Sequence, residues 1–346
     1  MDKILAKKDF PQWLKKLKSY RIYAPRKQDD IWNYEVVNES DDYHLPDVIT
    51  AAPAKKIVFP QRECFFKFSE TDESSFQITE LLPEETPVVV FGLRPCEGKA
   101  LILTDKVFGG KLEDPYYMKR RKATTFVGLA CSNPPSPNCF CLSVDGSPHS
   151  KEGLDLLLTD LGEAYYVESL TDKGEQLIRE GKMLFADAKP KDIKKVNEIH
   201  AEAEKKIPRQ LSRIESVRLK LRDMFDSHFW DEESMSCISC GICTYLCPTC
   251  HCFDINDEVE ASPPLQGKRV RTWDTCQFPD FTMHSSGHNP RPDKAARLRQ
   301  RINHKFQYFV EAWQHNQCTG CGRCISLCPV GIDIIKVVEK VRDYGS

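Results

Sequence analysis

Two short cysteine runs constrain this chain more than any other feature of its sequence. The first is CISCGICTYLCP, from Cys237 to Pro248, and the second is CTGCGRCISLCP, from Cys318 to Pro329. Both have the spacing C-x-x-C-x-x-C-x-x-x-C-P, which is typical of bacterial [4Fe-4S] ligands. Three thiolates at this spacing can wrap around three irons of a cube, and the proline keeps the chain from folding back over its own cluster. The two runs therefore predict two [4Fe-4S] clusters.

The fourth cysteine of each run is expected to serve the other cluster, as in two-cluster ferredoxins. The predicted ligands of the first cluster are Cys237, Cys240, Cys243 and Cys328. Those of the second cluster are Cys318, Cys321, Cys324 and Cys247. Three glycines between these ligands, Gly241, Gly320 and Gly322, suit tight turns because glycine lets the backbone approach the inorganic core.

Zinc is the main alternative, since C-x-x-C pairs also bind zinc. Four thiolates in two pairs satisfy a zinc ion, which explains neither the third evenly spaced cysteine of each run nor the proline. Iron–sulfur ligation is therefore the better interpretation of the two runs.

The overall composition narrows the setting of these sites. The 346 residues include 16 cysteines, 49 basic and 51 acidic side chains. A formal net charge of -2 removes the whole-chain electrostatic argument for nucleic acid or an anionic membrane. We expect a soluble cytoplasmic protein, because no secretory signal or apolar stretch of 18 residues is present and mean hydropathy is -0.47. Cytoplasmic cysteines stay reduced, which favours metal or redox chemistry over disulfides.

The first 200 or so residues predict an α/β domain, because apolar runs alternate with amphipathic segments. Buried strands are expected at three apolar runs: residues 56–60, 87–93 and 124–131. Helices are expected at 97–108, 155–161 and 173–181. From residue 192 to about 230 the pattern turns helical, with Pro208 as an interruption. We place the domain boundary there, giving an α/β domain at 1–207 and a helical two-cluster ferredoxin-type domain at 208–346.

The segment between Cys247 and Cys318 is longer than a small ferredoxin requires. Its sequence predicts helices and turns rather than strands, including a basic helix from about Pro292 to Trp313. By analogy with the iron–sulfur subunits of fumarate reductases, the expected fold is mainly α-helical.

Eight cysteines lie outside the two ligand sets. Cys96 and Cys131 each follow a predicted strand, and Cys139 and Cys141 lie on a nearby proline-rich loop. Loops at neighbouring strand ends meet at one edge of a sheet, so these four thiols could hold a third [4Fe-4S] cluster. They could also be ordinary buried cysteines. For Cys250, Cys252 and Cys276 we favour packing beside a cluster over ligation; the eighth cysteine is Cys64.

Several stretches together resemble a known family. They include GLRPCEGKAL, ACSNPPSPNCFC, CPTCHCFD and SSGHNPRPDKAARLRQRINHKF. The family is that of the iron–sulfur electron-transfer subunits of anaerobic sulfite reductases and the β subunits of cytoplasmic sulfhydrogenases, with related flavin oxidoreductase β-type subunits. The resemblance spans about residues 85–335. It implies the third cluster at Cys96, Cys131, Cys139 and Cys141. It also implies electron transfer between a partner that binds flavin and NAD(P) and a catalytic subunit of sulfite reductase, hydrogenase or heterodisulfide-reductase type.

An electron-transfer subunit of a hetero-oligomeric complex is thus the expected function, with no catalytic residue of its own. A reductase acting directly on a sulfur compound is the alternative, but the chain has no G-x-G-x-x-G fingerprint and no P-loop. A weaker alternative is a zinc-stabilised module that binds nucleic acid through the basic helix. The cations of that helix are better suited to stabilising a reduced cluster, which carries more negative charge. His284 and His288 are expected to be structural.

Overall fold

The larger of two β-sheets forms the core of the N-terminal part of the chain. The computed structural model describes residues 2–38, 41–72, 75–84 and 86–345. Eight strands pair in the order β10-β1-β9-β8-β7-β6-β2-β3, with parallel pairing from β2 through β6 and β7 to β8 and antiparallel pairing elsewhere. The strands are β1 (Lys3–Ala6), β2 (Arg21–Gln28), β3 (Ile31–Val36), β6 (Val88–Leu93), β7 (Thr124–Leu129), β8 (Leu156–Asp160), β9 (Ala164–Ser169) and β10 (Phe185–Asp187).

Helices cover both faces of this sheet because its central strands are apolar on both sides. Along β6, Val89 and Phe91 belong to one core with α1 (Phe10–Lys16) and α5 (Asp172–Glu180), whereas Val90 faces a second core with α3 (Pro95–Phe108) and α4 (Pro115–Ala123). Successive strand residues point to opposite faces, so one strand contributes to both layers. The expected strands at 87–93 and 124–131 and the expected helices at 97–108 and 173–181 are confirmed.

Two of the expected elements are wrong in type. Residues 56–60 were expected to form a strand, but α2 (Lys55–Val58) is a single helical turn there. Residues 155–161 were expected to form a helix, but they contain strand β8, whose first four residues are all buried. A short run of apolar residues has no polar alternation when both of its faces are covered, so its period cannot separate strand from helix.

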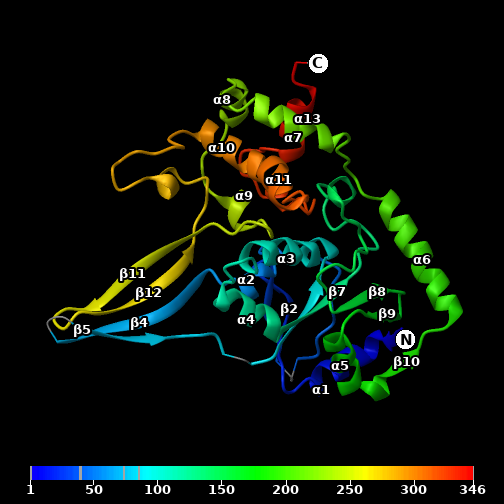
Figure 1. Cartoon of the computed structure of the whole chain (residues 1–346). Helices are drawn as coiled ribbons and strands as arrows, with labels where there is room; N and C mark the ends of the chain where they lie inside the picture. The colour runs from blue at the N-terminus through cyan, green and yellow to red at the C-terminus, as the bar shows by residue number, and fades with distance from the viewer. Residues whose placement is uncertain (1, 39–40, 73–74, 85, 346) are drawn as a thin grey trace.

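The C-terminal part of the chain is mainly helical, as expected. Figure 1 shows α6 (Pro190–Lys205) running along one side of the molecule towards a group of helices at the opposite end from the sheet. That group comprises α7 (Ile214–Asp223), α8 (Phe229–Ser234), α10 (Lys294–Asn303), α11 (Phe309–Trp313) and α13 (Ile334–Asp343). Val217, Leu221, Ile302 and Val338 are completely buried in its core. Four short 3-10 helices also occur in the described residues: η1 (Lys7–Asp9), η2 (Cys141–Val144), η3 (Lys182–Leu184) and η4 (Pro279–Thr282). A short π-helix, η5 (His304–Tyr308), follows α10.

A second sheet joins residues from both sides of the expected domain boundary. It is antiparallel, in the order β11-β12-β4-β5, with β4 (Arg62–Asp72), β5 (Ser75–Glu80), β11 (Phe253–Ala261) and β12 (Gln266–Trp273). Figure 1 shows it as an arm projecting from the body of the molecule. The expectation of helices and turns alone between Cys247 and Cys318 is therefore wrong. Strand β12 pairs with β11 on one side and with the distant β4 on the other. Most of β11 is exposed, and a strand without a buried face is weakly specified by its sequence.

Candidate metal centres

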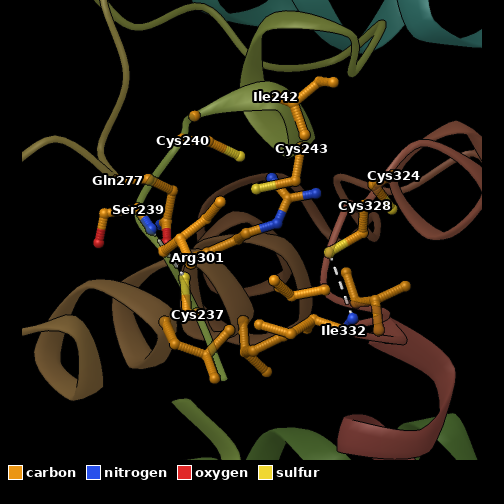
Figure 2. A pocket seen from close by; sticks show the side chains of 16 residues that line it. Cys237, Ser239, Cys240, Ile242, Cys243, Gln277, Arg301, Cys324, Cys328 and Ile332 are labelled. Atoms are coloured by element: carbon orange, nitrogen blue, oxygen red, sulfur yellow. Dashed lines mark hydrogen bonds between the residues drawn. The ribbon is translucent and has the colours of Figure 1, made fainter. Parts of the chain in front are cut away.

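The four predicted ligands of the first cluster line one pocket. Cys237, Cys240 and Cys243 come from the first cysteine run, and Cys328 reaches the same pocket from the second run. Figure 2 shows the sulfur atoms of these side chains around a common space. Backbone N–H groups donate to two of the sulfurs: Ser239 N to Cys237 Sγ at 3.4 Å and Ile332 N to Cys328 Sγ at 3.2 Å. The structure thus brings together the ligand set that includes the exchanged cysteine.

Both cysteine runs adopt the same backbone conformation. The residue before the second cysteine has a positive φ in each run, at Ser239 (57°) and Gly320 (67°). The residue after it does too, at Gly241 (73°) and Gly322 (74°), and each begins a short helix, α9 (Ile242–Tyr245) or α12 (Arg323–Ser326). Left-handed residues at these points turn the chain sharply, so successive cysteines can point to one side.

The predicted ligands of the second cluster act on one another electrostatically. Burial raises the pKa of the Cys324 thiol, and negative charge on Cys318, Cys247 and Cys321 raises it further. Burial likewise raises the pKa of Cys318 to about 11, with Cys247 and Cys321 adding to the shift. The Lys305 ammonium donates to Cys247 Sγ at 3.3 Å. Cys247 from the first run therefore lies with the first three cysteines of the second run.

The four cysteines expected to hold a third cluster line a second pocket. Cys96 lies at the N-terminus of α3, Cys131 follows β7, and Cys139 and Cys141 lie on the loop that enters η2. Strands β6 and β7 are parallel neighbours, which is why the loops that follow them meet at one sheet edge. Burial raises the pKa of both Cys139 and Cys141 to about 12. As free thiols they would be neutral, whereas a coordinating thiol is deprotonated by the metal.

Two buried arginines interact through their charge with thiols of these groups. Arg301, 5% exposed, extends into the first pocket in Figure 2 and also lies within reach of the charges on Cys243, Cys324 and Cys247. Arg323, 3% exposed, faces Cys321 and Cys96, and its guanidinium pairs with Glu97 at 3.0 Å. Burial opposes the charge of either guanidinium, yet the surrounding anionic groups raise both pKa values above their usual range.

The three cysteine groups adjoin one another in a definite order. Cys324, a predicted ligand of the second cluster, also lines the first pocket. Cys321, from the same predicted set, lines the second pocket with the four candidate ligands of the third cluster. The second group thus lies between the other two, with Arg301 at one junction and Arg323 at the other.

Several buried polar atoms near these thiols have no hydrogen-bond partner among the described residues. They are Arg301 Nη2, Arg323 Nη1, Thr319 Oγ1 and Ser132 Oγ. Thr319 and Ser132 directly follow Cys318 and Cys131, two of the predicted ligands. Buried donors are normally paired, so these atoms fit a group that brings its own acceptors, as the sulfides of an iron–sulfur cluster do. The unpaired buried atoms and the nearby thiols therefore both fit an anionic group that is rich in sulfur.

Over the described ranges, no three His, Cys, Asp or Glu side chains converge as the ligands of a single metal ion do.

Cys250, Cys252 and Cys276 lie near the ferredoxin ligands: Arg301 Nη1 is 3.7 Å from Cys250 Sγ, and Cys276 acts on Cys243 electrostatically. Cys64 is separate, on β4, where its thiol contacts the Phe66 carbonyl at 3.5 Å.

The basic helix contributes cations to the sites, as expected, but only some of its basic residues face thiols. Arg301 and Lys305 are buried against thiols, whereas Arg299 packs on the Phe225 ring at 3.8 Å. His284 and His288 lie on a turn closed by the His284 N–H and the His288 carbonyl at 2.8 Å.

Sequence reasoning missed two further buried arginines, Arg94 and Arg323. Arg94 donates to the Val48 carbonyl at 2.7 Å and pairs with Asp47, and the charge on Cys131 raises its pKa against the opposing effect of burial. Each of these arginines lies within two residues of a candidate ligand in the sequence, which could have drawn attention to it. Closeness in sequence does not by itself show whether an arginine is buried or solvated.

None of the helices in the described part of the chain is long and apolar enough to cross a membrane.

Comparison with known proteins agrees with this geometry. Residues 236–332 match the family model described as a 4Fe-4S dicluster domain. The chain therefore binds two [4Fe-4S] clusters through the region of the two cysteine runs. Along almost its full length it is also similar to a curated protein of Pyrococcus furiosus, sulfhydrogenase 2 subunit beta. The two are 32% identical over 336 residues, which cover 96% of each chain.

Proposed function

We propose that this chain, which belongs to the sulfhydrogenase β-subunit family, is the iron–sulfur electron-transfer subunit of a cytoplasmic oxidoreductase complex. The observation that carries the proposal is the contiguous order of three cysteine groups, in which Cys324 and Cys321 connect the middle group to the pockets on either side. Iron–sulfur clusters bound there supply one-electron redox chemistry. The ordered sites supply a route for electrons through the protein.

The residues of this chain hold and tune the sites. The proposed ligands are Cys237, Cys240, Cys243 and Cys328 for the first cluster, Cys318, Cys321, Cys324 and Cys247 for the second, and Cys96, Cys131, Cys139 and Cys141 for a third. Buried guanidinium and ammonium groups offset the charge of the thiolates and stabilise the more negative, reduced state. Cys131, Cys139, Cys141 and Cys247 are buried, seven of the other proposed ligands are half-buried, and Cys240 is exposed.

The partner subunits are proposed from the family. A sulfhydrogenase β subunit is by name part of a larger assembly, and we infer the same for this chain. One partner would bind flavin and NAD(P), and another would carry the catalytic centre, of hydrogenase, sulfite reductase or heterodisulfide-reductase type. Purification of the complex from its native source, followed by identification of the co-purifying subunits, tests this inference. If the isolated chain were stable and itself reduced a sulfur compound, the inference would be contradicted and the chain would be a reductase in its own right.

The number of clusters gives the sharpest test of the site assignment. Anaerobically purified chain should contain about twelve irons and about twelve acid-labile sulfides, because three [4Fe-4S] clusters each hold four. Cys139→Ser combined with Cys141→Ser should lower iron to about eight, because only the third set loses ligands. Iron and sulfide analysis measures both values.

Cys64→Ser is the matched control and should leave iron unchanged, because Cys64 lies outside all three sets. A count of about eight irons in both the unmodified chain and the double variant would contradict the third cluster while leaving the first two. Zinc without acid-labile sulfide would contradict the whole assignment.

A further inference from the structure

Two cysteines outside the proposed ligand sets lie together at the base of the β11–β12 hairpin. Cys252 directly precedes β11, and Cys276 follows shortly after β12. The ladder pairs Phe253 with Trp273, and one step further the Asp274 N–H donates to the Cys252 carbonyl at 3.0 Å. The hairpin thus returns the chain to its starting point, and the thiols of Cys252 and Cys276 hydrogen-bond to each other.

This contact differs from the contacts among the proposed cluster ligands. Cys131, for example, acts on Cys139 and on Cys141 through charge, and Cys139 acts on Cys141 in the same way. A cube binds each ligand at a separate iron, so its ligands need not touch. Cys247 and Cys250 also share a hydrogen bond, but Cys247 is itself a proposed ligand. Cys252 and Cys276 are the contacting pair for which the cluster assignments provide no role.

The surroundings of the pair favour a thiolate on Cys276. The thiol of Cys252 hydrogen-bonds to Cys276 Sγ, and Gln277 Nε2 donates to it at 3.4 Å. Arg301 and Lys305 add positive charge, and together these effects outweigh burial and lower the pKa of Cys276. The pKa of Cys252 shifts upward, first because of the same hydrogen bond. A thiolate in contact with a thiol is the arrangement of a redox-active pair.

The pair also adjoins ligands of both ferredoxin-type clusters. Cys276 acts on Cys243, a proposed ligand of the first cluster. On the other side, Cys252 interacts with Cys250, which contacts Cys247 of the second set. Electrons from either cluster would therefore have a short route to the pair.

We propose that Cys252 and Cys276 form a dithiol–disulfide couple that stores two electrons beside the two [4Fe-4S] clusters. On oxidation, the Cys276 thiolate and the Cys252 thiol form one S–S bond, the Cys252 S–H bond breaks, and one proton leaves to solvent. The two electrons pass singly to oxidised [4Fe-4S] clusters, and reduction reverses each change. The couple converts one-electron steps into a two-electron step. The inference rests on the proposed electron-transfer function, because the clusters are its electron source and sink.

A redox titration of the complete, cluster-loaded chain tests the couple. Samples are equilibrated anaerobically at a series of potentials, quenched in denaturant with an alkylating agent, and analysed by mass spectrometry. Fragment ions separate Cys252 from its neighbour Cys250. Alkylation of Cys252 and Cys276 should rise and fall together, with a tenfold change in the reduced-to-oxidised ratio for about every 30 mV, as a two-electron couple requires. Alkylation of Cys64 should not depend on potential.

The variants Cys252→Ser and Cys276→Ser should each retain the full iron content and abolish the potential dependence at the remaining cysteine. Loss of iron in either variant would overturn the proposal, because the residue would then be a metal ligand. Full alkylation of both cysteines at every potential would overturn it as well. These outcomes are distinct from failure of the proposed function, which would appear as missing iron, sulfide or cluster signals in the unmodified chain.

Discussion

Arg301 and Arg323 each face thiols from two neighbouring cysteine groups. Arg301 interacts with Cys243 of the first group and Cys324 of the second, and Arg323 with Cys321 of the second and Cys96 of the third. Each guanidinium is buried and keeps one nitrogen without a partner among the described residues. A fixed positive charge at a junction stabilises the extra electron on either side of it.

Replacing Arg301 with Gln should lower the reduction potentials of the first two clusters. Loss of the cation removes stabilisation from the reduced state more than from the oxidised state, since the reduced cluster is more negative. For unit charges about 8 Å apart at an effective dielectric constant of about 20, the interaction is roughly 2 kcal/mol, equivalent to roughly 90 mV for one electron. Potentiometric titration followed by electron paramagnetic resonance measures the shift.

Arg301→Lys should restore most of the potential, because it keeps the charge. Arg299→Gln is the matched control on the same helix, since Arg299 packs on Phe225 instead of a thiol. Equal shifts in the Arg299 and Arg301 variants would argue against a local electrostatic role for Arg301.

At the level of the secondary elements, the backbone of the second cysteine run packs closely against the loop that carries Cys139 and Cys141. The Phe140 N–H donates to the Gly320 carbonyl at 2.8 Å. A Cβ on Gly320 would lie 2.5 Å from the Cys141 backbone nitrogen, and one on Gly322 would lie 2.6 Å from the Asn138 carbonyl oxygen. Only glycine permits this approach, so two motifs that are far apart in the sequence depend on each other in the fold.

Gly320→Ala should therefore disturb the proposed third cluster as well as the second. The added methyl group would push on the backbone of Cys141, a proposed ligand, and we expect loss of up to about four irons from the third set. Iron analysis combined with resonance spectra of the separate clusters measures the effect.

Gly331→Ala is its control, because Gly331 has a similar positive φ of 72° but nothing within 4 Å of a Cβ. This comparison separates backbone strain from steric contact. Equal iron loss in both variants would show that the φ angle alone is responsible and would contradict the proposed role of this close packing.

Across the whole molecule, the two halves of the chain are connected through the small sheet. Strand β12 pairs with β4, and Arg271 on β12 forms a buried ion pair with Glu63 on β4 and a second with Asp114 before α4. The guanidinium also lies over the Phe59 ring at 5.0 Å. We propose that the boundary near residue 208 divides two packed cores rather than two independent folding units.

Glu63→Gln should destabilise the whole chain. The substitution leaves Arg271, only 1% exposed, without one of its two anionic partners, and such a loss typically costs about 3 to 5 kcal/mol. Anaerobic denaturant unfolding, followed by fluorescence and by iron release, measures the loss.

Asp257→Asn is the control from the neighbouring strand, because the Asp257–Arg269 pair lies at the surface and should contribute little. If Glu63→Gln released only the C-terminal helices while the large sheet stayed folded, the proposed coupling through the small sheet would be contradicted.

The sequence by itself determined the number and kind of the ferredoxin-type clusters, because ligand spacing is a local property that short cysteine runs express directly. It also determined the buried strands β6 and β7 and most helices, because apolar runs and helical periodicity are local. The sequence did not reveal strands that are stabilised by pairing with segments far away in the chain. Leu156–Asp160 became a strand through pairing with β7 and β9, and β11 and β12 formed with the aid of β4, which lies far away in the sequence.

Tertiary structure alone decided how the sites are arranged. No spacing rule joins Cys96 and Cys131 to Cys139 and Cys141, or Cys252 to Cys276; the parallel sheet and the hairpin bring them together. The same holds for Arg301 and Arg323, because the sequence shows a basic residue but not whether water or thiols surround it. Burial in a low-dielectric interior makes these charges costly unless they are compensated, and only the fold supplies the compensating group.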